Sequence, residues 1–172
     1  MRIPLWRNVY TAALSGVLLL GALIPGLAQA DASSDVEARN KQAVIEAFDR
    51  WGAGGTTFFR DMVAPDVVWT IKGSGPSAGV YRGLDTFLSK AVQPFVSRLS
   101  TTVRPVSKQV WADGDYVIIQ WEGTGEARDG QPYVNSYVWI FHMRDGKAYE
   151  VLAYLDLPAY DDVLQRIAAP AQ

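Results

Sequence analysis

Helical spacing dominates the first half of the chain. Apolar residues recur at intervals of three and four over 36–51 and again over 84–99, which is the spacing of a single helix face. A shorter apolar run at 57–63 predicts another helix, and the β-branched segment 66–71 predicts a strand. Pro94 lies inside the second long helix and is expected to bend it, because proline lacks the backbone N–H.

Alternation of apolar and polar residues replaces helical spacing after residue 102. Three Asp-Gly dipeptides interrupt the alternating runs, at 113–114, 129–130 and 145–146. Asp-Gly between alternating runs is typical of two-residue hairpin turns. The chain is therefore expected to form a four-stranded antiparallel meander followed by a short helix at 161–168. The four strands are expected at about 103–111, 116–126, 133–143 and 148–156.

Two-residue turns fix which residues pair, and pairing fixes which side chains share a face of the sheet. The mostly apolar face is expected to pack against the helices, with any cavity on that side. The opposite face mixes aromatic and polar side chains and suits a subunit interface, centred on Gln120, Glu122, Tyr137, Trp139 and Leu152. The turns would pair Ala112 with Asp115, Arg128 with Gln131, and Arg144 with Lys147.

Two polar residues stand out among the aromatic and branched residues of the last two strands. The expected register places Asn135 directly opposite Asp156, close enough for a hydrogen bond that would hold the end of the sheet. Asp156 is also placed to cap the last helix. Contact with a ligand is the alternative role for both residues.

Composition and charge narrow the possible functions. The length of 172 residues suggests one domain. The chain has no cysteine and one histidine, so we expect no disulfide, no thiolate chemistry and no metal site. The formal net charge is −2, and no basic patch argues for a nucleic-acid partner.

The N-terminus has the three parts of a secretory signal peptide. Arg2 and Arg7 precede an uncharged apolar run, which ends in the small-x-small pattern of Ala28, Gln29 and Ala30. Residues 1–30 are therefore expected to be a cleaved signal peptide. Residues 31–172 would then form one periplasmic or secreted domain without a stable membrane anchor. An uncleaved anchor is the alternative.

The order of these elements resembles the nuclear transport factor 2-like superfamily over about 36–167. The segments that carry the resemblance are PDVVWTIKGSGPSAGVYRG and YVNSYVWIF with DGKAYEVLAYLD. Within the superfamily, the chain is most similar to the SnoaL-like group related to polyketide cyclases and ketosteroid isomerases. The resemblance implies an α+β fold in which a curved antiparallel sheet wraps around the N-terminal helices, forming a cone with an apolar pocket.

The resemblance also implies where catalytic groups would lie. Three catalytic residues of ketosteroid isomerases have equivalent positions in this chain. The acid that binds the oxyanion corresponds to a position near Val138, the general base to one near Thr70, and the tyrosine of the first helix to one near Phe48. The pocket acid of limonene epoxide hydrolases corresponds to Ala153 of this chain. The strand that carries their arginine and acid corresponds to the region near Trp121. None of these five positions is ionisable, whereas proton transfer needs an ionisable group beside the substrate.

Three functions follow as hypotheses. The domain would bind a small apolar molecule, act on such a molecule as a lyase, cyclase or isomerase, or serve as a structural homodimer whose pocket is only core. We expect the first, with no cofactor and with a homodimer as the assembly; whether the chain is an enzyme stays open, and no catalytic residue is assigned. The expected ligand-binding residues are Phe48, Trp51, Trp69, Thr70, Tyr81, Phe87, Trp121, Ser136, Val138 and Ala153.

Export gives a first testable prediction. The mature protein recovered from the extracytoplasmic fraction should begin at Asp31, because the small-residue pattern ends at Ala30. Intact mass measurement determines the first residue directly. Recovery of the full-length chain in the membrane fraction would contradict cleavage.

Overall fold

The computed structural model describes residues 25–169. The helical elements are α1 (Pro25–Gly52), α2 (Phe58–Met62), α3 (Leu84–Phe87), the π-helical turn η1 (Leu88–Val92), α4 (Gln93–Val96) and α5 (Leu157–Arg166). The strands are β1 (Val63–Ile71), β2 (Gly79–Arg82), β3 (Leu99–Asp113), β4 (Tyr116–Ala127), β5 (Pro132–Arg144) and β6 (Lys147–Leu155).

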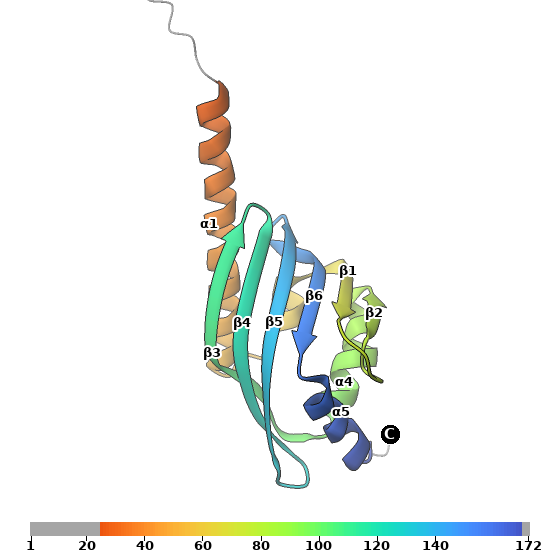
Figure 1. Cartoon of the computed structure of the whole chain (residues 1–172). Helices are drawn as coiled ribbons and strands as arrows, with labels where there is room; N and C mark the ends of the chain where they lie inside the picture. The colour runs from red at the N-terminus through yellow and green to blue at the C-terminus, as the bar shows by residue number, and fades with distance from the viewer. Residues whose placement is uncertain (1–24, 170–172) are drawn as a thin grey trace, which may run out of the picture.

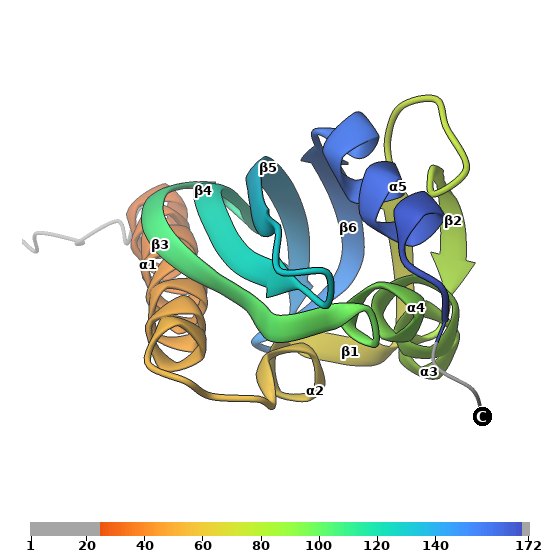
Figure 2. The same ribbon diagram turned by 90° about the horizontal axis from the view of Figure 1, so that it is seen from below.

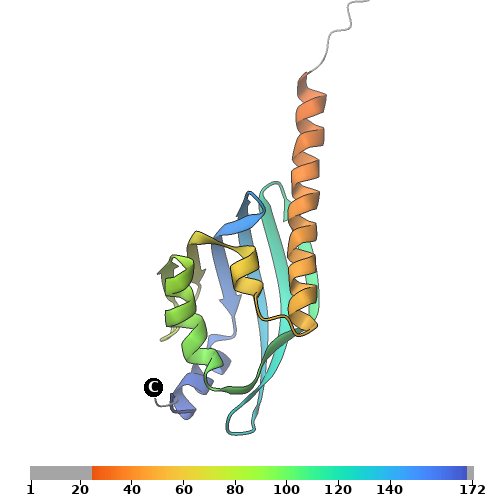
Figure 3. The same ribbon diagram turned by 180° about the vertical axis from the view of Figure 1, so that it is seen from behind.

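The six strands form one mixed sheet in the order β2-β1-β6-β5-β4-β3. Strand β1 runs parallel to β6, and the other neighbours are antiparallel. Figures 1 and 3 show α1, α2 and the α3–η1–α4 helix on one side of the sheet, with the other side uncovered. Figure 2 shows the sheet curling around them. The expected α+β fold with a curved sheet is confirmed; β2 and the parallel pair were not expected.

The core lies between the helices and the concave face of the sheet. Helix α1 contributes Val44 and Phe48, whose side chains are buried and lie on the face that its apolar spacing predicts. The sheet contributes Trp69, Trp121 and Phe141, which are among the largest fully buried side chains. Because the buried rings of these strands share one face of the sheet, the helices pack on that face.

The loop between β4 and β5 is longer than the expected two-residue turn. Strand pairing ends at Glu126 and Pro132, and the N–H of Ala127 donates to the carbonyl of Gln131 at 2.9 Å. The expected pairing of Arg128 with Gln131 is therefore wrong. The observed register differs from it by one residue, and a one-residue offset turns every side chain of β5 to the other face.

A second offset restores β6 to its expected face. Arg144 pairs with Lys147 as expected. Between Met143 and His142, however, the pairing of β5 with β6 shifts by one residue, as it does at a β-bulge. At the β3–β4 turn, Asp113 rather than Ala112 is the last paired residue of β3. That difference is two residues and leaves the faces unchanged.

The face of β5 is therefore a correction to the sequence analysis. Tyr137 and Trp139 lie on the concave face and are buried, so they cannot form the centre of an outer interface. Ser136 and Val138, which were expected to face the helices, lie on the uncovered outer face. Pairing of two copies through that outer face stays a prediction.

Pro94 coincides with a change in the helix that was expected over 84–99. Instead of one bent α-helix over 84–99, the structure has α3, the π-helical turn η1 and then α4, with Pro94 in the first turn of α4. The carbonyl of Ala91 accepts a hydrogen bond from the Tyr160 hydroxyl at 2.9 Å. Widened π turns of this kind occur frequently at functional sites.

The expected signal peptide falls mostly outside the described residues. Residues 25–30 form the first turns of α1, and residues 1–24 are not described. Cleavage and export stay predictions. Within 25–169, no helix is long and apolar enough to cross a membrane.

Gly123 provides a test of how tightly the concave face is packed. A Cβ atom at this position would lie 2.8 Å from both Trp121 and Val103 and 3.0 Å from Tyr137. Gly123→Ala should therefore lower the free energy of unfolding by about 1–3 kcal/mol. Gly79→Ala is the matched control, because its Cβ would meet no atom within 4 Å. Urea unfolding compares the two, and equal stabilities would contradict tight packing.

Candidate functional site: an aromatic cavity

A cavity of about 450 Å³ lies between the concave face of the sheet and the helices. Three kinds of lining residue form it: aromatic rings, small aliphatic side chains, and a few polar groups. The lining comprises Trp51, Gly55, Thr56, Thr57, Phe58, Phe59, Arg60, Trp69, Ile71, Phe87, Leu88, Ala91, Val92, Phe95, Val96, Thr102, Val103, Arg104, Trp121, Tyr137, Trp139, Ala153, Leu155 and Tyr160.

Ring contacts hold the cavity walls in place. Trp69 stacks on Phe87 with ring centroids 4.2 Å apart, and Trp121 stacks on Tyr137 at 3.8 Å. The ring of Trp139 stands edge-on to both tryptophans, at 5.1 Å and 4.9 Å. Such pairs add stability beyond the area that they bury, so these walls are expected to be rigid before any ligand arrives.

The indole nitrogen of Trp121 is buried and has no hydrogen-bond acceptor among the described residues. The rings of Phe48 and Trp51 pack edge-on against this indole. A buried donor without an acceptor costs roughly 1–3 kcal/mol. Because neighbouring atoms seal the nitrogen from the cavity space, it is not available to a ligand.

A buried polar network begins at Asn135. Its amide nitrogen donates to the Tyr133 hydroxyl at 2.7 Å and to the carbonyl of Asp156 at 2.9 Å. Its amide oxygen accepts the N–H of Asp156 at 2.9 Å. The expected link between these two residues is therefore present. It uses the backbone of Asp156, however, and the exposed Asp156 carboxylate makes no capping hydrogen bond to α5, contrary to the expectation of a side-chain cap.

The network continues to the cavity wall. The hydroxyl oxygens of Tyr133 and Tyr137 are 2.8 Å apart. Tyr133 is buried, and buried polar groups are almost always paired. Either hydroxyl can be the donor in this pair, and because Tyr137 lines the cavity, the network that begins at Asn135 places a hydroxyl at the cavity wall.

Burial keeps these phenols neutral. Desolvation raises the pKa of Tyr133 to about 12, although its bonds with Tyr137 and Asn135 act in the opposite direction. Desolvation and the neighbouring Tyr133 raise the pKa of Tyr137 well above its usual range, and desolvation does the same for Tyr160. All three hydroxyls can donate hydrogen bonds at neutral pH, but none can act as a base there.

Five of the ten expected site residues line the cavity: Trp51, Trp69, Phe87, Trp121 and Ala153. The other five do not. Phe48 lies behind the wall in the core, and Tyr81 lies beside Phe87 with its hydroxyl bonded to the Ser77 carbonyl. Thr70 pairs with Leu152, one residue out of step with the inward Trp69, so it lies on the outer face together with Ser136 and Val138.

Several lining residues were missed by the sequence analysis. Tyr137 and Trp139 alternate as a strand should, but the assumed two-residue turn assigned them to the wrong face. Tyr160 precedes the helix expected at 161–168, whereas α5 begins at Leu157 and brings this ring to the cavity. Thr102 and Arg104 come from the first part of β3, and nothing in the local sequence indicates that they reach the cavity.

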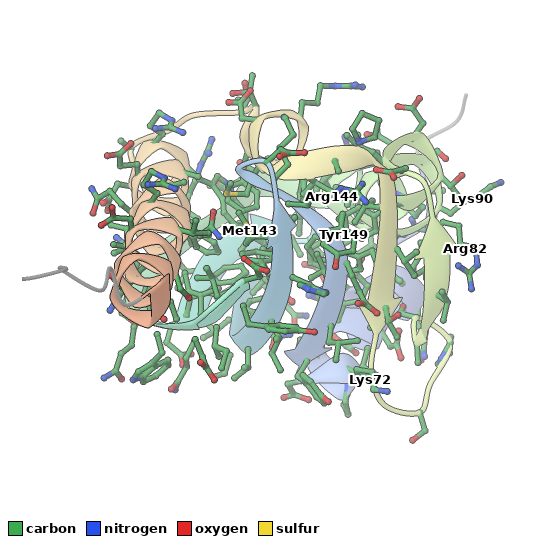
Figure 4. All side chains as sticks on the ribbon, turned by 90° about the horizontal axis from the view of Figure 1, so that it is seen from above. Lys72, Arg82, Lys90, Met143, Arg144 and Tyr149 are labelled. Atoms are coloured by element: carbon green, nitrogen blue, oxygen red, sulfur yellow. The ribbon has the colours of Figure 1, made fainter. Side chains whose placement is uncertain are left out.

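The single histidine lies away from the cavity. His142 pairs with Glu150 across the outer face, and its Nδ1 is 2.7 Å from the Tyr149 hydroxyl. The Arg144 guanidinium lies 4.5 Å from the centre of the Tyr149 ring, near the β5–β6 turn (Figure 4). His142 therefore contributes to the surface of the sheet and not to chemistry in the cavity.

Comparison with known families agrees with this architecture. The model of the SnoaL-like domain matches residues 44–151. This chain belongs to the SnoaL-like domain family. No curated protein matches the chain.

Solved structures with the same fold include three informative relatives. An NTF2-like protein from Burkholderia xenovorans is 22% identical, with a TM-score of 0.56, 74% of this chain covered and 97% of that one. Bal32a, from a soil-derived mobile gene cassette, is 18% identical, with a TM-score of 0.62 and coverages of 75% and 98%. TerC, crystallised with polyporic acid, is 18% identical, with a TM-score of 0.60 and coverages of 74% and 98%. The TM-scores show that these proteins share the fold of this chain, and at such identities the similarity extends to the fold alone.

The network at Asn135 yields a prediction that separates two neighbouring residues. Asn135→Ala should lower the free energy of unfolding by about 1–3 kcal/mol, because it leaves buried partners unpaired. Asp156→Ala should change it by less than about 0.5 kcal/mol, because the exposed carboxylate holds nothing in place. Urea unfolding of the two variants measures the difference. An equal loss in both would mean that the Asp156 carboxylate carries the link.

Proposed function

We propose that this domain binds a small, largely apolar molecule in the aromatic cavity and does not transform it. The observation that carries the proposal is the composition of the lining. Most of its side chains are aromatic or aliphatic, and it contains no carboxylate and no histidine. Its volume of about 450 Å³ falls within the range of roughly 300–1,000 Å³ that is typical of small-molecule sites.

The lining argues against proton abstraction as the function. The ionisable lining residues are Arg60, Arg104, Tyr137 and Tyr160, and neither arginines nor phenols of raised pKa are bases at neutral pH. The inward positions next to those of the base and acid in ketosteroid isomerases are Trp69 and Ile71 on β1 and Tyr137 and Trp139 on β5, and none of them is a carboxylate or a histidine. A lyase, cyclase or isomerase that needs a side-chain base therefore has no support from these residues.

A purely structural role leaves the cavity unexplained. Protein interiors are close-packed, and voids larger than a water molecule are few. Here the stacked walls surround an open space instead of closing it. The hydroxyl of Tyr137 is a polar group on the cavity wall that can orient a ligand. That a structural relative, TerC, was crystallised with polyporic acid also favours ligand binding for a domain of this fold.

We place this function outside the cytoplasm. The support is the N-terminal pattern of basic residues, apolar run and small-residue exit. The absence of cysteine is compatible with that location, because the aromatic core, and not disulfides, holds the domain together.

Filling the cavity tests the proposal. Val92 is half-buried in η1 and lines the cavity, so Val92→Trp should place an indole in the ligand's space. N-phenyl-1-naphthylamine, a neutral dye that fluoresces in apolar sites, serves as the probe. Its affinity should fall about tenfold to a hundredfold, since overpacking costs roughly 1–3 kcal/mol.

Val80→Trp is the matched control. Val80 is 55% exposed on β2 and does not line the cavity, so the same substitution there should leave dye titrations unchanged. Saturable dye binding that survives Val92→Trp would show that the cavity is not the binding site. No saturable binding by the wild type would contradict the proposed function itself.

A further inference from the structure

The polar groups of the cavity gather at one end. Apart from Tyr137 and Tyr160, the polar lining residues come from only two segments, the α1–α2 connection with the start of α2 and the first part of β3. They are Thr56, Thr57, Arg60, Thr102 and Arg104. The cavity thus has an apolar body and a polar end, and a ligand that fits both must itself be amphipathic.

Arg104 is fixed at this polar end. Its Nη1 atom donates to the carbonyls of Trp51 at 3.0 Å and of Gly55 at 2.6 Å, so the side chain is held against the end of α1. A guanidinium has five N–H donors on three nitrogens. Among the described residues, the other two nitrogens of Arg104 have no acceptor, and no carboxylate pairs with this side chain. Bracing the α1–α2 connection therefore uses only one nitrogen of the group.

The positive charge at this end is not neutralised by the lining. Arg60 is the other cation of the lining, and it forms an ion pair with Asp85 at 3.9 Å. The side chains of that pair are 68% and 93% exposed, so the attraction between them is weak. The lining contains two guanidinium groups and no acid. Apolar walls around charges of a single sign focus the electric field and attract an ion of the opposite sign.

We propose that the ligand of this cavity is an amphipathic anion, with an apolar ring system or chain in the aromatic body and a carboxylate or similar oxyanion at Arg104. Arginine suits this task because its planar fork matches the two oxygens of a carboxylate. The inference rests on the proposed binding function and adds the chemical class of the ligand. It also assigns Arg104 as the residue that selects the anion.

Matched acids and amides test the charge preference. The probes are 2-naphthoate with 2-naphthamide and octanoate with octanamide, which share shape within each pair and differ in charge. Isothermal titration calorimetry at pH 7 should give an affinity about tenfold or more higher for at least one acid than for its amide, because charge-assisted hydrogen bonds are roughly twice as strong as neutral ones. Raising the salt concentration should reduce that ratio.

Variants assign the preference to a residue. In Arg104→Gln the ratio of acid to amide affinity should fall to about one, while the amide affinity, which reports an intact cavity, stays the same. Arg104→Lys keeps the charge and should keep part of the preference. Arg82→Gln is the control, because Arg82 is exposed at the sheet edge on β2 and projects away from the molecule (Figure 4); its ratio should equal that of the wild type.

The outcomes separate the two proposals. Equal affinity of acid and amide in the wild type overturns the anionic class and leaves the binding function standing. A preference that survives in Arg104→Gln overturns the role of Arg104. Loss of amide binding together with acid binding in both Arg104 variants shows that the residue only braces the α1–α2 connection, which also overturns its role. Absence of binding by either pair to the wild type overturns both proposals.

Discussion

The offset of β5 by one residue against β4 is the constraint on which the cavity depends. Side chains alternate between the faces of a sheet, so a strand has only two ways to present its residues. The five residues from Ala127 to Gln131 select the one that turns Tyr137, Trp139 and Phe141 toward the helices. The bulge at His142 then lets β6 keep its own small residues inward. In the other register, the concave face would hold Ser136, Val138 and Ile140 in place of three rings.

The same offset also brings polarity into the core. Asn135 is buried because it lies on the same face of β5 as Tyr137. A buried amide lowers stability unless its polar groups are hydrogen-bonded. The backbone of Asp156 and the hydroxyl of Tyr133 supply those partners. This pairing has two consequences: the end of β6 is fixed where α5 begins, and the hydroxyl of Tyr137 is held at the cavity wall.

Helix α5 closes the sheet end of this arrangement. It is tied to the sheet through Asn135, to the helix over the cavity through the bond from Tyr160 to the Ala91 carbonyl, and to the β1–β2 connection through the Ser77 hydroxyl, which donates to the buried Asp161. These three attachments add to the packing of Leu157, Tyr160 and Val163, which are buried in the core. They also position Tyr160 and the π turn, so the shape of the cavity depends on contacts made far apart in the sequence.

The sequence alone was sufficient for the fold class, the family resemblance and most of the helices and strands, because helix and strand spacing are local properties of the chain. It also indicated, through Val138, Thr70 and Ala153, that the usual acidic positions are not ionisable. Tertiary structure decided which face of β5 is buried, because the lengths of a loop and a bulge depend on backbone hydrogen bonds that the Asp-Gly dipeptide does not specify. It alone placed Arg104 and Tyr160 at the cavity, since β3 and α5 reach it by packing against segments that are distant in the sequence. The sequence shows that a residue is charged. Packing between distant segments decides whether that residue faces a cavity and whether an opposite charge lies beside it.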